Sequence, residues 1–323
     1  MRRSRRRGPP FRRAEGIERA DPERCWPMVR EHVQRIGLLP HTEKQPAVDA
    51  ARDVLQFLES AGAQVVLEPE AAALIGRHDL AEPGSWSDLD AAVVLGGDGA
   101  VLRAARKLAP WRVPILSVNV GRLGFLTQVE HEELPAALER LLAGDYDVEE
   151  RLMLEAGVVR EGRRVVRSIG LNDAVVTRGT VARIIHIQVR VGGELVLDYA
   201  GDGIVVATPT GSTGYSLSAG GPIVNPRVQS LLLTPICPHS LSTRPVITRP
   251  EEEVRILVQA AHTDMMLTVD GQVGVGLASG DEVFVRRAGH RARLIRIGQG
   301  RFYRKLRARL GQAPGERGPE SEG

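Results

Sequence analysis

The sequence predicts an α/β domain with a doubly wound parallel sheet, followed by a C-terminal β-rich domain. Strand-like and helix-like segments alternate between residues 34 and 143, which is typical of right-handed βαβ units. Strand-like runs then dominate from residue 151 to about residue 297. The length of 323 residues fits two domains of ordinary size.

The elements of the first domain follow from the spacing of apolar residues. This spacing predicts strands over 34–39, 63–67, 89–95 and 113–118, and helices over 46–61, 100–108 and 132–143. The run 89–95 is continuously apolar, as expected for a strand that is covered on both faces. The polar stretch around Gly76, Pro83 and Gly84 predicts a loop.

The second domain is predicted as a series of strands separated by turns. The expected strands are 152–159, 164–177, 184–191, 194–199, 203–207, 254–258, 265–269, 282–286 and 292–297. A short helix is expected after Gly211, and another helix over 301–310. We therefore expect an α/β nucleotide-binding domain at 34–150 and a β-rich domain at 151–300, with disordered ends at 1–33 and 311–323.

Composition excludes several classes of protein. Hydrophobic residues make up 42% of the chain and charged residues 26%, which excludes a disordered or collagen-like protein. No apolar stretch reaches the roughly 18 residues that suggest a membrane span, so no membrane partner is expected. The two cysteines, Cys25 and Cys237, form no CxxC pair, which argues against a disulfide framework or a cysteine-rich zinc site and fits the cytoplasm.

The positive charge is concentrated at the N-terminus. Residues 1–13 contain seven arginines and no acid, so the net charge of +3 leaves the remaining 310 residues at −4. This arginine-rich composition is compatible with a solvated extension and with a nucleic-acid-binding arm. We interpret the tail as a solvated extension. A third interpretation is that translation starts at Met28 and that residues 1–27 are not part of the protein.

The first candidate site is Gly96-Gly97-Asp98-Gly99, directly after a predicted strand and before a predicted helix. In a doubly wound sheet this is the crevice at the carboxyl ends of the strands, where ligands bind. Glycines there let the backbone approach a phosphate. A carboxylate beside a phosphate needs a reason, such as a metal, a sugar or a hydroxyl to activate. The alternative interpretation is a tight turn that caps the helix.

Three further segments carry candidate residues. The run 208–223 is dense in glycine and hydroxyl residues, which favours close approach of a ligand over a purely structural turn. Asn172 and Asp173 interrupt an apolar run and need polar partners if they are buried. These partners could belong to a ligand or, in the alternative interpretation, to a helix cap or a turn. The segment 268–272 reads most simply as an Asp-Gly turn between strands.

Several known motifs are absent from the sequence. There is no GxxxxGK[ST] loop, no GxGxxG after a strand, no HExxH pair and no GxSxG elbow. The eight histidines show no spacing that is typical of a metal site.

Taken in order, the motifs resemble those of the ATP-dependent NAD kinase family over residues 34–310. They are GGDG at 96–99, NxGxLGFL at 119–126, Asn-Asp at 172–173, DGIVVATPTGSTGYSLSAGGPI at 202–223 and TVDGQ at 268–272. The GGDG motif alone is shared with 6-phosphofructokinases and with diacylglycerol and sphingosine kinases. The long glycine-rich motif is similar to that of NAD kinases, and the PxGTGND-like stretch of the lipid kinases is missing.

The resemblance implies transfer of the γ-phosphoryl group of ATP to the 2′-hydroxyl of the adenosine ribose of NAD, giving NADP and ADP. Asp98 would accept the proton of this hydroxyl, and divalent metal, normally Mg²⁺, would accompany the nucleotide. The final helix would pack back on the first domain. Family members are commonly homodimers or homotetramers, so a homo-oligomer is expected.

By the same resemblance, the remaining motif residues would bind the nucleotides. Gly97 and Gly99 would approach the phosphates, Asn172 and Asp173 the ribose and nicotinamide end of NAD, and Thr213, Gly214, Tyr215 and Ser218 the adenine and its ribose. Phe125 would form a wall of the NAD site, Asp202 would give a supporting polar contact, and Asp270 would reach the NAD site of a neighbouring subunit.

The chain departs from the family pattern at three places. Glycine stands at 214 where alanine is common, Asp173 replaces the frequent glutamate, and the turn at 39–41 lacks the usual asparagine. The runner-up hypothesis is a kinase that phosphorylates another hydroxyl, such as that of a lipid, and forms no NADP. A non-catalytic regulator that binds NAD is the second alternative, and it would have no need of a base at Asp98.

Overall fold

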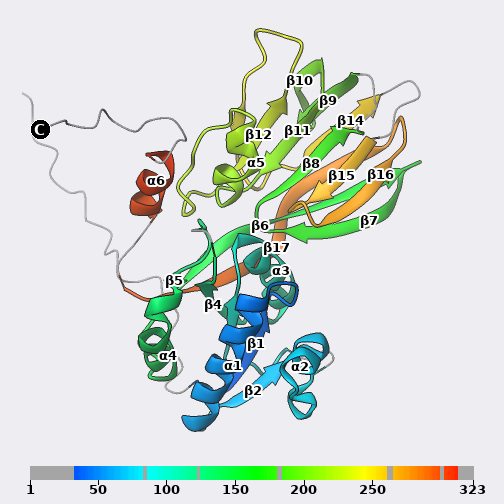
Figure 1. Ribbon diagram of the computed structural model, residues 1–323. Coiled ribbons are helices and arrows are strands. Elements are labelled where there is room, and N and C mark those ends of the chain that lie inside the picture. Colours follow the sequence, from blue (N-terminus) through cyan, green and yellow to red (C-terminus); the bar gives the residue numbers. More distant parts are fainter. Residues whose placement is uncertain are drawn as a thin grey trace, which may run out of the picture.

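The computed structural model describes residues 33–82, 86–121, 124–179, 184–259, 265–298 and 302–311. The expected extension and tail lie outside these ranges except for their innermost residues, Val33 and Gly311. Figure 1 shows an α/β part that contains the N-terminal elements and a β-rich part above it in the view. The predicted fold class, an α/β domain plus a C-terminal β-rich domain, is confirmed.

Four parallel strands form the centre of the first domain. They are β1 (Arg35–Pro40), β2 (Gln64–Leu67), β3 (Ala91–Leu95) and β4 (Pro114–Asn119), in the order β2-β1-β3-β4. The two-residue strand β5 (Val129–Glu130) pairs with the end of β4. All four predicted strands are present, and their carboxyl ends lie at one edge because the pairings are parallel.

Helices cover both faces of this sheet. On one face, α1 (Gln45–Ser60), α2 (Pro69–Ile75) and α4 (Leu134–Leu142) share a core with Val93 and Leu95. On the other face, α3 (Asp98–Leu108) packs with Ala92 and Val94. Three 3₁₀ turns lie between these elements, η1 (His78–Leu80), η2 (Ala109–Trp111) and η3 (His131–Glu133).

The helix α2 was not predicted, since only a loop was expected before β3. Its sequence, PEAAALI, has proline at the first helical position, and Gly76 ends it in a left-handed conformation with φ +84°. Both are ordinary helix boundary signals.

Two long strands join the domains. The strand β17 (Glu282–Arg296) pairs in parallel with β4 and antiparallel with β6 (Asp147–Arg160). The sheet thereby continues into the second domain through β7 (Arg163–Gly170), β9 (Ile185–Val191), β10 (Glu194–Gly201) and β14 (Val254–Gln259). The two strands expected at 282–286 and 292–297 are one strand, with its pairing shifted between Arg287 and Arg291.

A second sheet packs on this extension. It has the order β13-β12-β11-β8-β15-β16, and all its pairings are antiparallel. Its strands are β8 (Asp173–Arg178), β11 (Gly203–Ala207), β12 (Leu231–Ile236), β13 (Val246–Thr248), β15 (Met265–Val269) and β16 (Val273–Leu277). Apolar residues of both sheets share one core, which includes Leu154, Val176, Ile187 and Ile204.

Here too the structure corrects the sequence prediction. The single strand expected at 164–177 is two strands, because the chain leaves one sheet at Gly170 and enters the other at Asp173. The strands β12, β13 and β16 were not predicted; β12 carries Pro235 and β16 carries two glycines, which weaken the strand signal.

Three short helical segments complete the chain. The 3₁₀ turn η4 (Gly211–Thr213) and α5 (Tyr215–Ser218) follow β11, where a short helix was expected. The helix α6 (Phe302–Leu310) follows β17. It contacts both domains, because Lys305 donates to the Thr127 carbonyl and Tyr303 accepts a hydrogen bond from Asn225. No helix of the described ranges is long and apolar enough to span a membrane.

Candidate active site

Asp98 lies at the carboxyl edge of the parallel strands, and a loop after β4 binds its carboxylate. It is the first residue of α3, three residues after the last residue of β3. The backbone N–H of Phe125 donates to Oδ2 at 2.9 Å, and the N–H of Leu126 donates to Oδ1 at 3.0 Å. These bonds fix the orientation of the carboxylate. Since they go to the loop and not to α3, the alternative of a helix-capping aspartate does not hold.

The glycines around Asp98 fall into two kinds. A Cβ on Gly124 would lie 1.9 Å from Asp98 Oδ1, so the loop can close on the carboxylate only with glycine there. In contrast, a Cβ on Gly97 would meet no atom within 4 Å, and one on Gly99 only Gln272 Nε2 at 3.7 Å. The backbone at 97–99 is therefore open to a ligand at the N-terminal turn of α3, which favours an anion.

Asn172 and the glycine-rich loop after β11 lie against each other. The Asn172 carbonyl accepts the N–H of Thr208 at 2.8 Å, and a Cβ on Gly211 would lie 2.1 Å from the same oxygen. A Cβ on Gly214 would lie 3.5 Å from Asn172 Nδ2. The side-chain Oδ1 of Asn172 is buried without a hydrogen-bond partner in the described part of the chain. The structure thus brings two of the predicted segments together around a polar atom that a ligand could satisfy.

The hydroxyl-bearing residues of this loop differ in exposure. Thr213 is half-buried and donates to the Thr210 carbonyl at 3.3 Å, whereas Tyr215, 45% exposed, and Ser218 face outward. The neighbouring Ser212 is buried and holds the loop through bonds to Pro209 and Val224. The loop is therefore fixed from inside and presents other side chains at its surface.

Asp173 is buried, and its neighbourhood is unfavourable for a charge. Desolvation by burial, together with the nearby Asp270 carboxylate, raises the pKa of Asp173 to about 7. A buried carboxyl with such a pKa beside a glycine-rich loop is typical of functional sites.

The Asp270 carboxylate is bound by groups of its own chain. Its side chain is 0% exposed and accepts the backbone N–H groups of Leu171, Asn172 and Asp173 at 2.7–3.2 Å. Arg106 of α3 donates to its Oδ2 at 3.0 Å. The carboxylate is thus occupied within its own chain, because the turn after β15 folds inward onto this segment.

Asp202 does not join the other candidate residues either. It lies beside Gly203, which pairs with Thr177, whereas Asp173 pairs with Ala207 at the opposite end of the same two strands. Five residues of strand correspond to about 17 Å. Asp202 instead receives the Arg178 guanidinium at 2.6 Å, which holds the pKa of this carboxyl below its usual range. A supporting contact of Asp202 to the site of its own chain is therefore not observed.

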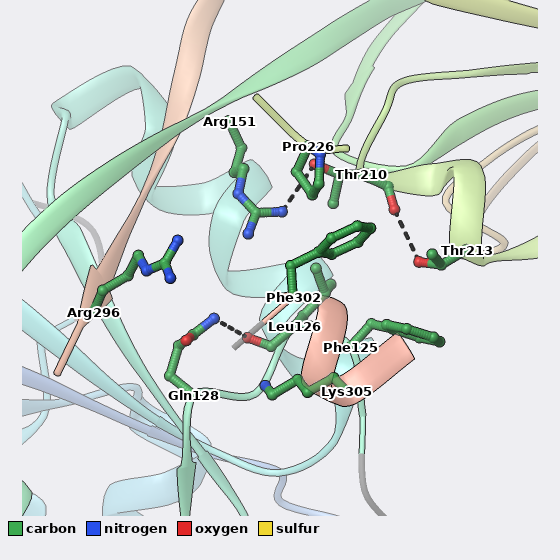
Figure 2. Close-up of a pocket in the computed structure, with 10 residues that line it drawn as sticks. All are labelled: Phe125, Leu126, Gln128, Arg151, Thr210, Thr213, Pro226, Arg296, Phe302 and Lys305. Carbon is green, nitrogen blue, oxygen red and sulfur yellow. Dashed lines mark hydrogen bonds between the residues drawn. The ribbon is translucent and has the colours of Figure 1, made fainter. Parts of the chain in front are cut away.

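A pocket lies beside these residues, between both domains and α6 (Figure 2). Its walls are Phe125, Leu126, Gln128, Arg151, Thr210, Thr213, Pro226, Arg296, Phe302 and Lys305. The ring of Phe125 lies under the Arg309 guanidinium, 5.0 Å from its centroid. Because Leu126 and Phe125 also bind Asp98, the pocket and the carboxylate share one loop.

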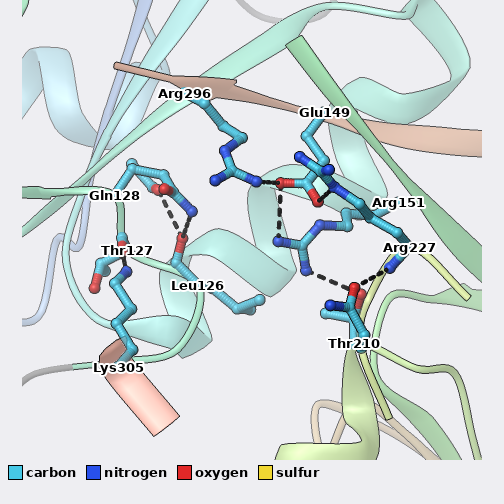
Figure 3. A network of polar contacts seen from close by, with 11 residues as sticks. Leu126, Thr127, Gln128, Glu149, Arg151, Thr210, Arg227, Arg296 and Lys305 are labelled. Carbon is cyan, nitrogen blue, oxygen red and sulfur yellow. Dashed lines mark hydrogen bonds and ion pairs between the residues drawn. The ribbon is translucent and has the colours of Figure 1, made fainter. Parts of the chain in front are cut away.

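The inner wall of the pocket carries a cluster of charged side chains around Glu149 (Figure 3). Arg296 donates to its carboxylate, Arg151 lies 3.4 Å from it and Arg227 lies 3.6 Å from it. Burial alone would raise the pKa of Glu149, but Arg151 and Arg296 hold it below its usual range. Arg151 also donates to Thr210 Oγ1 at 3.3 Å, which ties the cluster to the glycine-rich loop.

No role was predicted for Glu149, Arg151 or Arg296 from the sequence. A signal existed, since the charged residues of EERLMLEAG stand inside an apolar strand and must be paired if buried. The sequence could not identify the partners, because Arg296 is 147 residues away from Glu149.

Within the described residues, no three His, Cys, Asp or Glu side chains gather where they could bind a metal ion.

Comparison with known proteins gives consistent matches over both domains. Residues 36–146 match the family model of the ATP-NAD kinase N-terminal domain, and residues 171–297 match the ATP-NAD kinase C-terminal domain. The chain is 47% identical to an NAD kinase of Symbiobacterium thermophilum, over 85% of this chain and 98% of the relative. It is 44% identical to an NAD kinase of Moorella thermoacetica, over 86% of this chain and 89% of the relative.

Solved structures agree with the same fold. A crystal structure of yeast NADH kinase complexed with NADH matches with a TM-score of 0.78 at 25% identity, covering 88% of this chain and 89% of that one. An NAD kinase from Archaeoglobus fulgidus in complex with ATP matches with a TM-score of 0.68 at 25% identity, covering 86% and 99%.

Proposed function

The chain belongs to the ATP-NAD kinase family, and from this membership we propose how its site performs the reaction. The protein is an NAD kinase, which transfers the γ-phosphoryl group of ATP to the 2′-hydroxyl of the adenosine ribose of NAD and releases NADP and ADP. The observation that carries the proposed mechanism is the Asp98 carboxylate, oriented by two backbone N–H groups beside the open backbone of Gly97.

Asp98 acts as the general base in this proposal. One of its oxygens accepts the proton of the ribose 2′-hydroxyl while the hydroxyl oxygen attacks the γ-phosphorus, and the bond to the bridging oxygen of ADP breaks. Bonds from Phe125 and Leu126 keep the carboxylate in place before substrate arrives, so that less reorganisation is needed during the reaction. The N-terminal turn of α3 and the backbone of Gly97 and Gly99 receive the phosphates of the nucleotide.

The β-rich domain supplies the proposed contacts to NAD. The orphaned Oδ1 of Asn172 supports a contact to the ribose and nicotinamide end, with Asp173 beside it. The loop after β11 binds the adenine and its ribose through Thr213, Gly214, Tyr215 and Ser218, and Phe125 forms a wall. This assignment fits the contact of Gly214 with Asn172 and the position of Phe125 and Thr213 in one pocket.

Three further properties belong to the proposal. Mg²⁺ arrives with the phosphates of ATP as part of the substrate and offsets their charge during the transfer. The enzyme acts in the cytoplasm, where ATP and NAD are both present and where the exposed free thiol of Cys237 would stay reduced. It forms a homodimer or homotetramer, which sedimentation of the purified protein would test.

The decisive test is the variant Asp98→Asn in an assay that couples NADP formation to an NADP-specific dehydrogenase. We expect turnover with NAD, ATP and Mg²⁺ to fall by about 10²–10⁴-fold while NAD binding persists. Asp145→Asn, at an exposed surface carboxylate, is the matched control and should stay active. Near-normal turnover of Asp98→Asn would exclude the base assignment, and wild-type protein that binds NAD but forms no NADP would favour the lipid-kinase or regulator hypotheses.

A second variant tests the phosphate approach. Gly97→Ala adds a methyl group that meets no atom within 4 Å, so stability should be unchanged. We expect kcat/KM for ATP to fall by about tenfold or more, because the methyl group would stand where the phosphates approach. Gly289→Ala, which also adds its methyl group to open space, is the control. An unchanged kcat/KM for ATP would mean that the phosphates do not approach Gly97.

A further inference from the structure

The helix that carries Asp98 is connected to the β-rich domain by two side chains. Arg106 of α3 donates to Asp270 Oδ2 at 3.0 Å and also to the side-chain oxygen of Gln272. The amide Nε2 of Gln272 in turn donates to the carbonyl of Gly99 at 2.9 Å. The turn after β15 therefore contacts α3 at both its first and its last turns.

The same turn fixes the segment that is proposed to bind NAD. Asp270 Oδ1 accepts the N–H of Asn172 at 2.7 Å and that of Asp173 at 3.2 Å, while Oδ2 accepts that of Leu171 at 3.0 Å. A Cβ on Gly170 would lie 2.6 Å from Val269, so this segment lies directly against the turn. One carboxylate thus joins three consecutive backbone N–H groups to an arginine of the other domain.

Charge makes Arg106 the essential member of this connection. The Asp270 side chain is 0% exposed and that of Arg106 only 15%. Among the described residues, Arg106 is the single cation within ion-pair distance of Asp270. Removal of the guanidinium would leave a buried carboxylate without a counter-charge, which is strongly unfavourable. Asp173 adds a second carboxyl close by, so the region has no surplus of positive charge.

We propose that Arg106 is a positioning residue of the phosphoryl transfer, which fixes the helix of Asp98 against the segment 171–173 of the NAD-binding domain. This inference rests on the proposed function. Asp98 and Arg106 are eight residues apart on one helix, about 12 Å along its axis. Arg106 does not touch the reacting atoms in this arrangement. It orients the helix against the nucleoside-binding segment, and displacements of about 1 Å between reacting groups cost about 10²-fold in rate.

The test compares Arg106→Met, Arg106→Lys and the double variant Arg106→Met with Asp270→Asn. We expect Arg106→Met to lower kcat by about 10–100-fold with a smaller change in KM for ATP, since the phosphate-binding backbone at 97–99 keeps its conformation. Arg106→Lys should recover part of kcat, because lysine restores the charge and one hydrogen bond. Asp270→Asn should partly rescue Arg106→Met, because it removes the uncompensated charge and keeps an oxygen for the 171–173 N–H groups.

Arg103→Met is the matched control, because Arg103 is an exposed arginine on the same helix. It should keep kcat within about twofold of the wild type. Circular dichroism gives the folded fraction of each variant, and Arg106→Gln replaces Arg106→Met if the latter does not fold. A folded Arg106 variant with wild-type kcat, or a loss of kcat that only follows the folded fraction, would overturn the proposal. Wild-type protein without any NADP formation would instead overturn the proposed function.

Discussion

Two buried carboxylates, Asp270 and Glu149, lie close to residues of the candidate site, and their surroundings differ in charge. The Asp270 cluster consists of Asp270, the three N–H groups of 171–173 and a single cation, Arg106, all within 3.2 Å. The Glu149 cluster consists of Glu149 and three arginines, two of them at 3.4 and 3.6 Å.

The difference shows how one type of residue serves two purposes. In the Asp270 cluster each charge has an opposite partner and the hydrogen bonds are short, as expected of a rigid connection. In the Glu149 cluster three guanidiniums share one carboxylate, and Arg151 Nε is buried without a partner in the described residues. Burial is the main cause that lowers the pKa of Arg151; Glu149 opposes it, and Arg296 and Arg227 add to it. Such a wall attracts anionic substrates to the adjacent pocket.

The largest effect is expected when the Asp270 cluster is broken. Asp270→Ala leaves Arg106 and three backbone N–H groups without an acceptor, and should lower the free energy of unfolding by about 3–5 kcal/mol in urea denaturation. Asp270→Asn keeps an oxygen for the N–H groups and should cost less, about 1–3 kcal/mol. Equal and small losses in both variants would show that the cluster does not hold the domains together.

A smaller effect is expected from pH, through the carboxyl beside Asp270. The pKa of Asp173 is raised to about 7 in the folded protein, against 3.8 ordinarily. The folded state therefore keeps a proton that the unfolded chain loses, and stability falls as the pH rises from about 4 to about 7. Asp173→Asn lacks this dependence. It should match the wild type near pH 4 and be more stable above pH 7 by up to about 4 kcal/mol in thermal unfolding.

Parallel unfolding curves for the two proteins across this pH range would show that Asp173 is ionised throughout. The Asp270 cluster and Asp173 would then together carry a net negative charge, and the Asp270 cluster could no longer be described as balanced in charge.

The smallest effect is expected within the Glu149 cluster. Here the informative result is which of two variants loses more stability. Glu149→Gln leaves three guanidiniums facing one another and should cost about 2 kcal/mol, partly recovered in high salt because Arg227 is 63% exposed. Arg151→Met removes one surplus charge and should cost only about 1 kcal/mol. Denaturation of both variants at low and high salt tests this order, and the reverse order would mean that the cluster carries no surplus charge.

The local parts of the fold were predictable from the sequence, and the failures have specific causes. The strands β3 and β4 and the helix α3 came from apolar spacing alone. The strand β17 was divided in two, because Gly289 and His290, with arginines on both sides, interrupt its apolar pattern where the pairing shifts. The helix α2 was missed because a segment of seven residues is too short to show the helical spacing of apolar residues clearly.

The candidate site was predictable by residue type and only partly by arrangement. The motif at 96–99 identified Asp98 as a candidate, and the motif at 119–126 contains Gly124. Only the structure shows that the loop packs against α3 and that a side chain at Gly124 would collide with the Asp98 carboxylate. The hydrogen bonds of Asp270 within its own chain were not predicted, because an Asp-Gly turn looks the same in sequence whether it faces outward or inward. The motif did not indicate that Asp202 lies beside the end of β11 that is away from Asp173.

The sequence by itself determined most of the strands and helices, the position of Asp98 between a strand and a helix, and the family of enzymes that the motifs resemble. These properties depend on residues near one another in the chain. Only the tertiary structure decided that Arg106 meets Asp270, 164 residues away, and that Arg296 meets Glu149, 147 residues away. Pairing between distant charges depends on which surfaces the packed sheets bring into contact, and no local pattern encodes that choice.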